Sequence, residues 1–227
     1  MRSANHEVLS FCADDAHGAP IMMKADELGI KPTDFIDQVK KSHEESLRRF
    51  GIRYTNYHST HSEENESLVS EIYMAAKSAG NIYKTDIEQC FDEEKQMFLA
   101  DRYVIGDCPK CGATNQYGDG CDVCGATYSA TELVNQKSAL SGTTPIEKIS
   151  EHVFFDLEKE KENLANFLKN SSIQSTIVSK LSEWLNDDLR GWDISRDSPY
   201  FGFQIPEENE KYFYVWVDAP IGYMASA

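Results

Sequence analysis

The chain has little positive charge. Its 227 residues include 22 Lys and Arg against 38 Asp and Glu, which gives a formal net charge of −16. Because strong nucleic-acid binding depends on clustered cations that neutralise phosphates, this balance argues against the chain as a whole being a strong nucleic-acid binder. Any contact with nucleic acid would have to be local.

Long hydrophobic runs are also missing. No stretch of about 18 apolar residues exists, and the opening sequence MRSANHEV has no apolar segment of the kind found in secretory signals. These absences argue against a membrane span and a secretory peptide, and they predict a cytoplasmic protein. The 41% of hydrophobic residues still suffices for a core, in one large domain or in one domain with an insertion.

Cysteines are few, but four of the six lie within residues 108–124. They form two C-x-x-C pairs separated by nine residues, and turn-forming residues lie beside each pair. Two such knuckles can direct four thiolates to one point, as a closed tetrahedral zinc site requires. The predicted ligands of one structural zinc ion are Cys108, Cys111, Cys121 and Cys124. Rubredoxin-type iron and a redox-active dithiol are the alternatives.

The first part of the chain alternates strand and helix signals. Residues 7–12 form an apolar run that predicts a buried strand, and polar residues follow it directly. Helices are expected over 20–28 and 32–50, a second strand over 52–57, and a helix after Thr60 and Glu63, which have capping-box spacing. This order predicts an α/β fold with a doubly wound parallel sheet.

A different pattern begins near residue 81, with short strand-like segments around the cysteines. Two helices are expected over 158–168 and 172–189, the second with Trp184 in the core, and no internal repeat is visible. Residues 211–217 are β-branched and aromatic, which favours a buried strand, and a helix is expected after Asp218. The predicted fold is therefore a partial Rossmann sheet interrupted by a zinc-knuckle insertion.

Several segments, in this order and at these separations, resemble the methionyl-tRNA synthetases, a family of class I aminoacyl-tRNA synthetases. The segments are FCADDAHGAPI, YHSTHSEEN, CPKC, CDVC, WDISRDSPYFGF and YFYVWVDAPIGYM. The resemblance implies a Rossmann catalytic domain split by a connective-peptide domain with structural zinc. Residues 1–62 would form the first part of the catalytic domain, 63–213 the connective-peptide domain and 214–227 the start of the second Rossmann half.

The resemblance also implies a reaction. Enzymes of this family join methionine to ATP, with Mg²⁺, to give methionyl-adenylate, and then pass the methionyl group to the 3′ end of tRNA(Met). The family's two ATP-handling signatures, H-x-G-H and K-M-S-K-S, are absent from these 227 residues. The expectation is an internal fragment of the enzyme, monomeric and inactive by itself.

Site residues follow from the same resemblance. Asp15 is expected to pair with the α-ammonium group of methionine, Arg196 to hold Asp15 in place, and His58, with His61, to lie near the adenylate. His17 is expected to position groups and not to act as a base. The expected methionine pocket consists of Trp216, Ala219, Pro220 and Tyr223.

Each role has a structural alternative. Asp15, together with Asp14, could cap the next helix, and Trp216 could be strand core because it alternates with Tyr214 and Asp218. Arg196 could form an ordinary salt bridge. His58 and His61 could serve only the start of a helix.

One rival function comes from another class of protein. A synthetase-like paralogue without catalytic activity could use the zinc-stabilised fold to bind RNA or protein. A redox protein that uses its cysteines is a third possibility. Flanking H-x-G-H and K-M-S-K-S segments would favour the enzyme, and labile thiols or bound iron would favour the redox protein.

Overall fold

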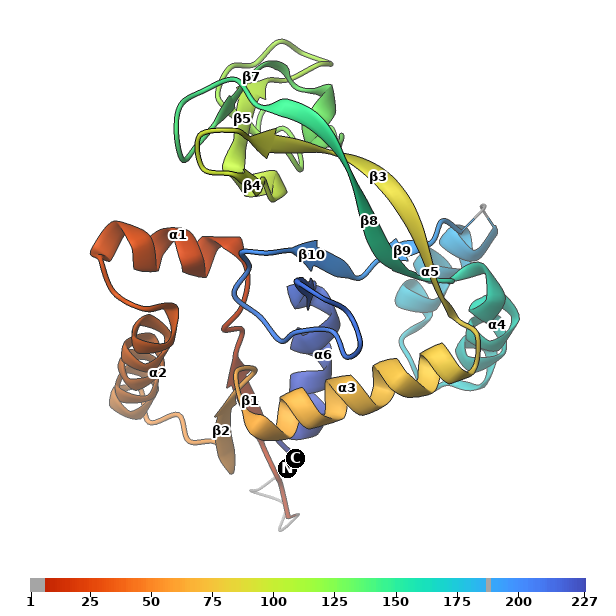
Figure 1. Cartoon of the computed structure of the whole chain (residues 1–227). Helices are drawn as coiled ribbons and strands as arrows, with labels where there is room; N and C mark the ends of the chain where they lie inside the picture. Colours follow the sequence, from red (N-terminus) through yellow and green to blue (C-terminus); the bar gives the residue numbers. More distant parts are fainter. Residues whose placement is uncertain (1–6, 187–188) are drawn as a thin grey trace.

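The computed structural model of the chain describes residues 7–186 and 189–227 (Figure 1). Among these residues, the strands form four small sheets, and one strand pairing, β1 with β2, is parallel. The other pairings in the described residues are antiparallel. The fold is therefore mixed α/β, but the described part of the chain does not show the doubly wound parallel sheet that the sequence predicts.

The parallel pair consists of β1 (Phe11–Asp14) and β2 (Asn56–Ser59), connected through α1 (Ala19–Leu28) and α2 (Pro32–Arg49). Each strand begins four residues later than predicted, because the apolar runs that begin at residues 7 and 52 lie mostly ahead of the paired segments. An apolar run indicates that a strand exists, but backbone pairing with the neighbour decides where it starts and ends.

α3 (Glu63–Ser78) starts differently from the prediction. The hydroxyl of Ser62 accepts a hydrogen bond from the backbone N–H of Asn65 at 3.4 Å, so Ser62 is the N-cap. Thr60 does not cap the helix, because its hydroxyl accepts a hydrogen bond from the N–H of Ala16 at 2.8 Å and so ties β2 to the end of β1. The capping-box prediction for Thr60 is wrong.

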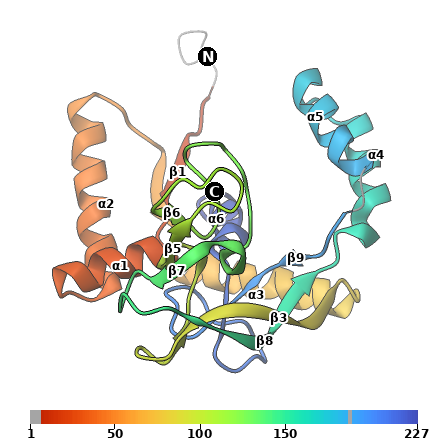
Figure 2. The ribbon, with the colours of Figure 1, turned by 90° about the horizontal axis from the view of Figure 1, so that it is seen from above.

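A long antiparallel hairpin dominates the middle of the chain. β3 (Ile82–Asp92) pairs with β8 (Ile146–Phe155), and its far end leads into the small sheet that surrounds the cysteines (Figures 1 and 2). The shorter elements of this region are β4 (Met97–Phe98), η2 (Asp101–Tyr103), β5 (Val104–Asp107), β6 (Gln116–Tyr117), η3 (Ala130–Glu132), β7 (Val134–Ser138) and β9 (Trp192–Asp193). Sheet order is β4-β3-β8-β9 in the hairpin and β6-β5-β7 at its end.

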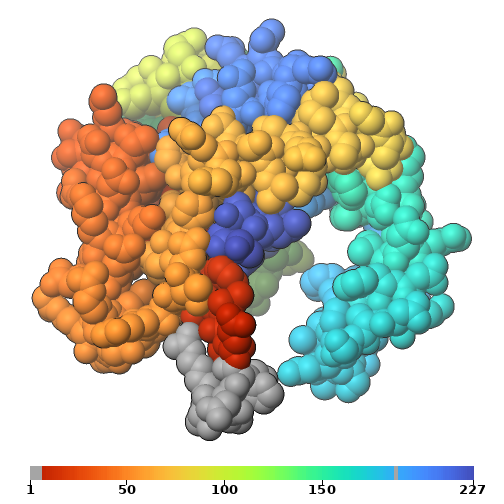
Figure 3. All heavy atoms as spheres, turned by 90° about the horizontal axis from the view of Figure 1, so that it is seen from below, coloured from red at the N-terminus to blue at the C-terminus, as the bar shows by residue number. Residues whose placement is uncertain are grey.

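Two helices follow the hairpin, after the short η4 (Glu158–Glu160). α4 (Lys161–Asn170) and α5 (Ser175–Asn186) stand apart from the parallel pair, and open space separates them from the body (Figure 3). Trp184 is 58% exposed, so its predicted core position is wrong. Residues 187–188, part of the predicted helix 172–189, lie outside the described residues. Of the helices in the described ranges, none is long and apolar enough to cross a membrane.

The last elements are β10 (Ser195–Asp197), β11 (Lys211–Phe213) and α6 (Val215–Ala225). The predicted strand 211–217 is wrong after Phe213, because Val215 and Trp216 already belong to the helix. The local preference of β-branched and aromatic residues for strands is overridden by tertiary packing, since α6 packs along α3 and touches β1.

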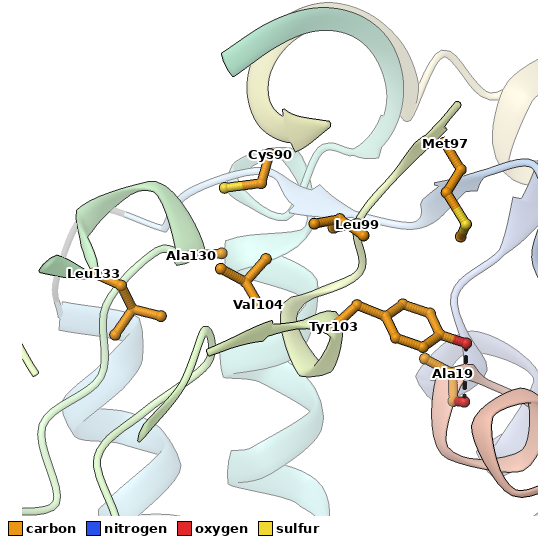
Figure 4. Close-up of a cluster of buried hydrophobic side chains, with 8 residues drawn as sticks. All are labelled: Ala19, Cys90, Met97, Leu99, Tyr103, Val104, Ala130 and Leu133. Atoms are coloured by element: carbon orange, nitrogen blue, oxygen red, sulfur yellow. Dashed lines mark hydrogen bonds between the residues drawn. The ribbon is translucent and has the colours of Figure 1, made fainter. Parts of the chain in front are cut away.

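Two apolar cores hold these parts together. One joins the start of α1 to the cysteine-bearing region, and the hydroxyl of Tyr103 within it donates a hydrogen bond to the carbonyl of Ala19 (Figure 4). The other core joins α3, the hairpin and β11 through Val69, Tyr73, Val153, Ile194, Phe203, Ile205 and Phe213. Val217 and Ile221 of α6 pack on the second core, and α6 also contacts β1.

Candidate functional site

One face of α6 is exposed and rich in aromatic residues. Its residues recur at the i, i+3, i+4 and i+7 spacing that aligns side chains on a helix, and they are Trp216, Ala219, Pro220 and Tyr223. Trp216 is 65% exposed and Tyr223 is 67% exposed. The alternative interpretation of Trp216 as strand core is therefore wrong. The structure brings the four residues of the predicted methionine pocket together on one surface.

Trp216 borders two cavities. The first, of about 280 Å³, lies between α3, α6 and the base of the hairpin, and its apolar lining includes Ile72 and Phe155. The second, of about 260 Å³, has aromatic and charged walls that include Tyr214 and Arg196. A site at this tryptophan thus combines room for an apolar side chain with polar groups that could orient it.

Asp15 directly follows β1, at the carboxyl end of the parallel pair, which is where ligands commonly bind in open α/β sheets. Its side chain is exposed. Desolvation by the surrounding protein raises the pKa of Asp15, and so does the negative charge of Asp218, whereas His17 acts in the opposite direction. No side chain caps α1, so helix capping does not account for Asp15.

Asp14, by contrast, is engaged within the protein. It accepts a hydrogen bond from the hydroxyl of Tyr57 at 2.5 Å, and Nδ1 of His43 lies 2.7 Å from the same oxygen. The carboxylate therefore connects β1 to β2 and α2. Asp14 therefore has a structural role, but it does not cap α1.

A buried polar cluster lies behind Asp15. Nδ1 of His17 contacts Oδ2 of Asp218 in a short hydrogen bond, and its Nε2 lies 2.9 Å from Nδ1 of His61. Burial raises the pKa of Asp218, although the hydrogen bond from His17 opposes this shift. Burial lowers the pKa of His61, because it disfavours the charged form of the imidazole. Phe203 packs edge-on against His17 and is stacked with His61. The cluster fixes the start of α6 against the end of β1.

The four predicted zinc ligands also come together. The sulfur atoms of Cys108, Cys111, Cys121 and Cys124 all lie within 4.8 Å of one another. The Cys108–Cys124 and Cys111–Cys121 sulfurs are 3.8 and 3.6 Å apart. Four sulfurs placed about 2.3 Å from a central zinc ion would be separated by about 3.8 Å, so the geometry fits a tetrahedral thiolate site.

The two knuckles have the same local structure. The segments CPKCGAT and CDVCGAT repeat one pattern, which the sequence analysis missed when it found no repeat. The backbone N–H groups of Gly112 and Gly125 donate to the carbonyls of Cys108 and Cys121, both at 2.9 Å. Both glycines have φ near +70°, at +73° and +71°, a region that favours glycine. The repeated turn is what aims each cysteine pair at the common centre.

A family model described as "tRNA synthetases class I (M)" matches residues 1–227. The chain belongs to this family. Two structures of Mycobacterium tuberculosis methionyl-tRNA synthetase with methionyl-adenylate have a similar fold, with TM-scores of 0.70 and identities of 17% and 18%. Each match covers 100% of this chain and 40% of the synthetase chain. The free form of that enzyme matches 86% of this chain and 35% of its own, at 17% identity and a TM-score of 0.55. The chain thus spans 40% of the length of the first two synthetases.

Two of the residues expected from the synthetase resemblance, Arg196 and His58, form contacts with carboxylates other than Asp15. Arg196 contacts Asp193 at 3.4 Å and donates to the carbonyl of Ser195 at 2.6 Å, so the carboxylate beside it is not Asp15. His58 lies 3.5 Å from Glu64 in the first turn of α3, as its helix-start alternative predicts. His61 and His17, not His58, form the histidine pair of this synthetase chain.

The sequence analysis missed one buried cluster of the synthetase chain. His152 is 1% exposed and lies between Asp193 and Asp197, and Lys211 binds the second of these carboxylates. His152 and Lys211 are far apart in the sequence, and their strands meet only in the folded chain. The two aspartates of WDISRD indicated that cationic partners should lie nearby, but nothing in the sequence identified those partners as His152 and Lys211.

Proposed function

We propose that this chain forms the methionine-binding part of a methionine–tRNA ligase. The observation that supports this most strongly is the exposed face of α6, which carries Trp216, Ala219, Pro220 and Tyr223 at helical spacing. Membership of the class I (M) synthetase family supports an aminoacylation reaction, and the similar structures contain methionyl-adenylate. Methionine and ATP are the proposed substrates, ATP as its Mg²⁺ complex, and tRNA(Met) is the acceptor.

The proposed roles follow from the chemistry of methionine. Its thioether side chain packs against the aromatic face of α6, where each sulfur–aromatic contact contributes about 0.3–1.5 kcal/mol. The Asp15 carboxylate, exposed at the end of β1, pairs with the α-ammonium group through a charge-assisted hydrogen bond. The pairing also relieves the repulsion between Asp15 and Asp218 that raises the pKa of Asp15.

The buried cluster of His17, His61 and Asp218 has a positioning role in this proposal. It holds the first turn of α6 against the segment that follows β1, and thereby sets the distance between Asp15 and the aromatic face. Adenylate formation depends on the alignment of a carboxylate that is already ionised at neutral pH with the α-phosphate of ATP. A base that removes a proton is therefore not needed at this step.

The cysteine cluster is proposed to hold one structural zinc ion. All four protein ligands are thiolates, and they complete a tetrahedron without an open position for water or substrate. A metal bound in this way supplies folding free energy to the small sheet β6-β5-β7. No step of the reaction passes through it.

We further propose that residues 1–62 and 214–227 belong to the catalytic domain and that 63–213 form a connective-peptide domain. The chain spans 40% of the length of the similar synthetases, and neither H-x-G-H nor K-M-S-K-S occurs in it. ATP handling would then depend on segments outside this chain, and the 227 residues alone would bind methionine as a cytoplasmic monomer without forming the adenylate.

The proposal is tested by methionine binding and by ATP–pyrophosphate exchange. Calorimetry on the 227-residue chain should detect methionine binding that weakens about tenfold or more in Asp15→Asn and in Trp216→Ala, since each removes a charged or aromatic contact. Asp26→Asn on α1 and Trp184→Ala on α5, both exposed and remote from the site, are the matched controls.

The exchange reaction is measured in a synthetase that carries this chain together with both ATP-handling segments. Methionine-dependent exchange that collapses in Asp15→Asn and in Trp216→Ala is the expected result. A folded, zinc-loaded protein without exchange or methionine binding would overturn the proposal and would favour the non-catalytic RNA- or protein-binding paralogue.

A further inference from the structure

The structure gives His152, on β8, an unusual environment. Its Nδ1 lies 2.9 Å from Oδ2 of Asp193, and its Nε2 lies 2.9 Å from Oδ2 of Asp197. With a carboxylate at each nitrogen, the ring can donate from both only in its charged form. The side-chain amide of Gln89 also contacts Nε2 of His152. Burial by itself opposes this charge, but the hydrogen bonds to the two carboxylates outweigh burial and raise the pKa of His152.

Asp197 also has partners other than His152. Nζ of Lys211, on β11, contacts Oδ1 of Asp197 and donates to the hydroxyl of Ser150 at 2.8 Å. The Ser150 hydroxyl in turn donates to Asp197 at 2.9 Å. This carboxylate is therefore held by β8 and β11 even without the histidine.

Asp193 leads from His152 toward the α6 face. Its Oδ2, which binds His152, also lies 3.4 Å from NH1 of Arg196. The guanidinium of Arg196 lies over the ring of Tyr214 at 3.9 Å. The Tyr214 and Trp216 rings are stacked at 6.1 Å with an interplanar angle of 14°. A continuous series of contacts thus runs from a buried histidine of the long hairpin to the exposed tryptophan.

We propose that charged His152 is a positioning residue for the methionine site. His152 holds Asp193, and Asp193 in turn keeps Arg196 over the ring of Tyr214, beside Trp216. The inference rests on the proposed function for its methionine part, but the positioning of Arg196 can be measured without any ligand. It gives the hairpin that bears the cysteine cluster a direct connection to the aromatic face of α6. His152 does not touch the substrate.

The charged surroundings of His152 determine how the contact series responds to pH. The titratable and charged groups around it are Asp193 on β9, Arg196 and Asp197 on β10 and Lys211 on β11, together with Glu88, Cys90 and Asp101 across a shared cavity of about 130 Å³. Because the pKa of His152 is raised above its ordinary value, the imidazolium persists to a higher pH than in an ordinary histidine and is lost as the pH rises further. If the proton leaves from Nδ1, Asp193 loses its contact with the imidazolium but keeps the hydrogen bonds from the N–H and the hydroxyl of Ser195, at 3.1 and 3.3 Å. We expect the carboxylate to shift and Arg196, which it contacts, to move relative to Tyr214.

Arginine side-chain NMR tests the positioning directly. The Nε–Hε signal of Arg196 in the ¹⁵N-labelled chain is assigned by its absence in Arg196→Lys. We expect this proton to be protected from exchange with solvent and its chemical shift to be changed by the ring of Tyr214. We expect His152→Gln and Asp193→Asn to abolish that shift. The control Glu151→Gln, on the same strand and paired with Lys84 at the surface, should retain it. An unchanged Arg196 signal in folded His152→Gln overturns the proposal.

A pH titration of the wild-type chain covers the case in which His152→Gln does not fold. The Arg196 shift should disappear with the same midpoint as the titration of the His152 ring carbons. An Arg196 signal that stays constant while His152 loses its proton overturns the positioning.

Methionine calorimetry on the same samples separates this inference from the proposed function. We expect His152→Gln to raise the Kd for methionine about tenfold, since Asp193 loses one of the donors that hold it beside Arg196. A wild-type chain that binds no methionine, while its Arg196 signal depends on His152, supports the positioning and counts against the methionine site. A folded His152→Gln with unchanged affinity and an unchanged Arg196 signal overturns the positioning alone.

Discussion

Asp218 and His17 are separated by 201 residues, yet they form a hydrogen bond in which both side chains are 0% exposed. The second oxygen of Asp218 has no protein partner among the described residues. A buried carboxylate with one free acceptor is energetically costly unless the surrounding structure fixes it. At the scale of single residues, the site therefore depends on contacts between side chains that are too far apart in the sequence for a motif to predict their pairing.

Asp197 gives a pH-dependent prediction. Burial acts to raise its pKa, but the hydrogen bonds from His152 and Lys211 outweigh burial and lower the pKa from 3.8 to about 2. Because the folded-state pKa lies below the unfolded value, this carboxylate stabilises the protein above about pH 4, and the stabilisation is lost as the pH falls through about 2. The shift corresponds to about 2 kcal/mol.

Urea unfolding of wild type and Asp197→Asn at pH 5 and pH 2 measures this contribution. We expect the free energy of unfolding of the wild type to fall by about 2 kcal/mol more than that of the variant over this range. Parallel pH dependences of the two proteins would contradict the assignment. Asp86→Asn, an exposed carboxylate on β3, serves as the control.

At the scale of elements, α6 has two faces with different tasks. Ile221 packs against the core that joins α3 to the hairpin, whereas Trp216 is 65% exposed. Ile221→Ala should lower the free energy of unfolding by about 2 kcal/mol, and Trp216→Ala by less than about 1 kcal/mol, because only the first leaves a cavity.

Urea unfolding of the two variants provides the measurement, with methionine calorimetry beside it. Trp216→Ala should lose methionine binding while its stability stays close to that of the wild type. A larger loss of stability in Trp216→Ala than in Ile221→Ala would place the tryptophan in the core and would remove the basis of the exposed face.

The knuckles form a second element-scale unit. Cys111→Ser removes one of four thiolates that lie within 4.8 Å of one another, so the chain should lose its zinc and the small sheet β6-β5-β7 should unfold. Metal analysis and amide hydrogen exchange measure the two effects. Cys12→Ser, a free cysteine outside the cluster, should retain both zinc and protection. A chelator-treated chain whose small sheet keeps its protection would contradict a structural role.

At the scale of the whole molecule, stability is unevenly distributed. The parallel pair has four half-buried positions in β1, and α2 buries Ile36 alone, while Phe50 and Ile52 beyond it are 84% and 46% exposed. The hairpin, by contrast, is paired over its full length and is joined to both cores. The segment before α3 should therefore open more readily than residues 82–155.

Limited proteolysis of the zinc-loaded chain with subtilisin, followed by mass spectrometry, tests this difference. We expect early cleavage within residues 50–55 and late cleavage within the hairpin and the knuckles. Equal resistance of the 1–62 segment and the cysteine-bearing region would contradict the prediction.

Features that depend on local chemistry could be predicted from neighbouring residues. The two C-x-x-C-G turns direct their own cysteines, Pro32 starts α2 where it was predicted, and the motifs identify the synthetase family. Such features need only a few neighbouring residues, because turn geometry and helix starts are set by the residues that form them.

Features that depend on distant partners arise only when the chain folds. It ended the strand 211–217 at Phe213 and turned Trp216 outward on a helix, because packing of α6 against α3 outweighs local strand preference. It also placed His152 between Asp193 and Asp197. The free energy of these arrangements comes from burial and hydrogen bonding across elements, which no local segment of the sequence contains.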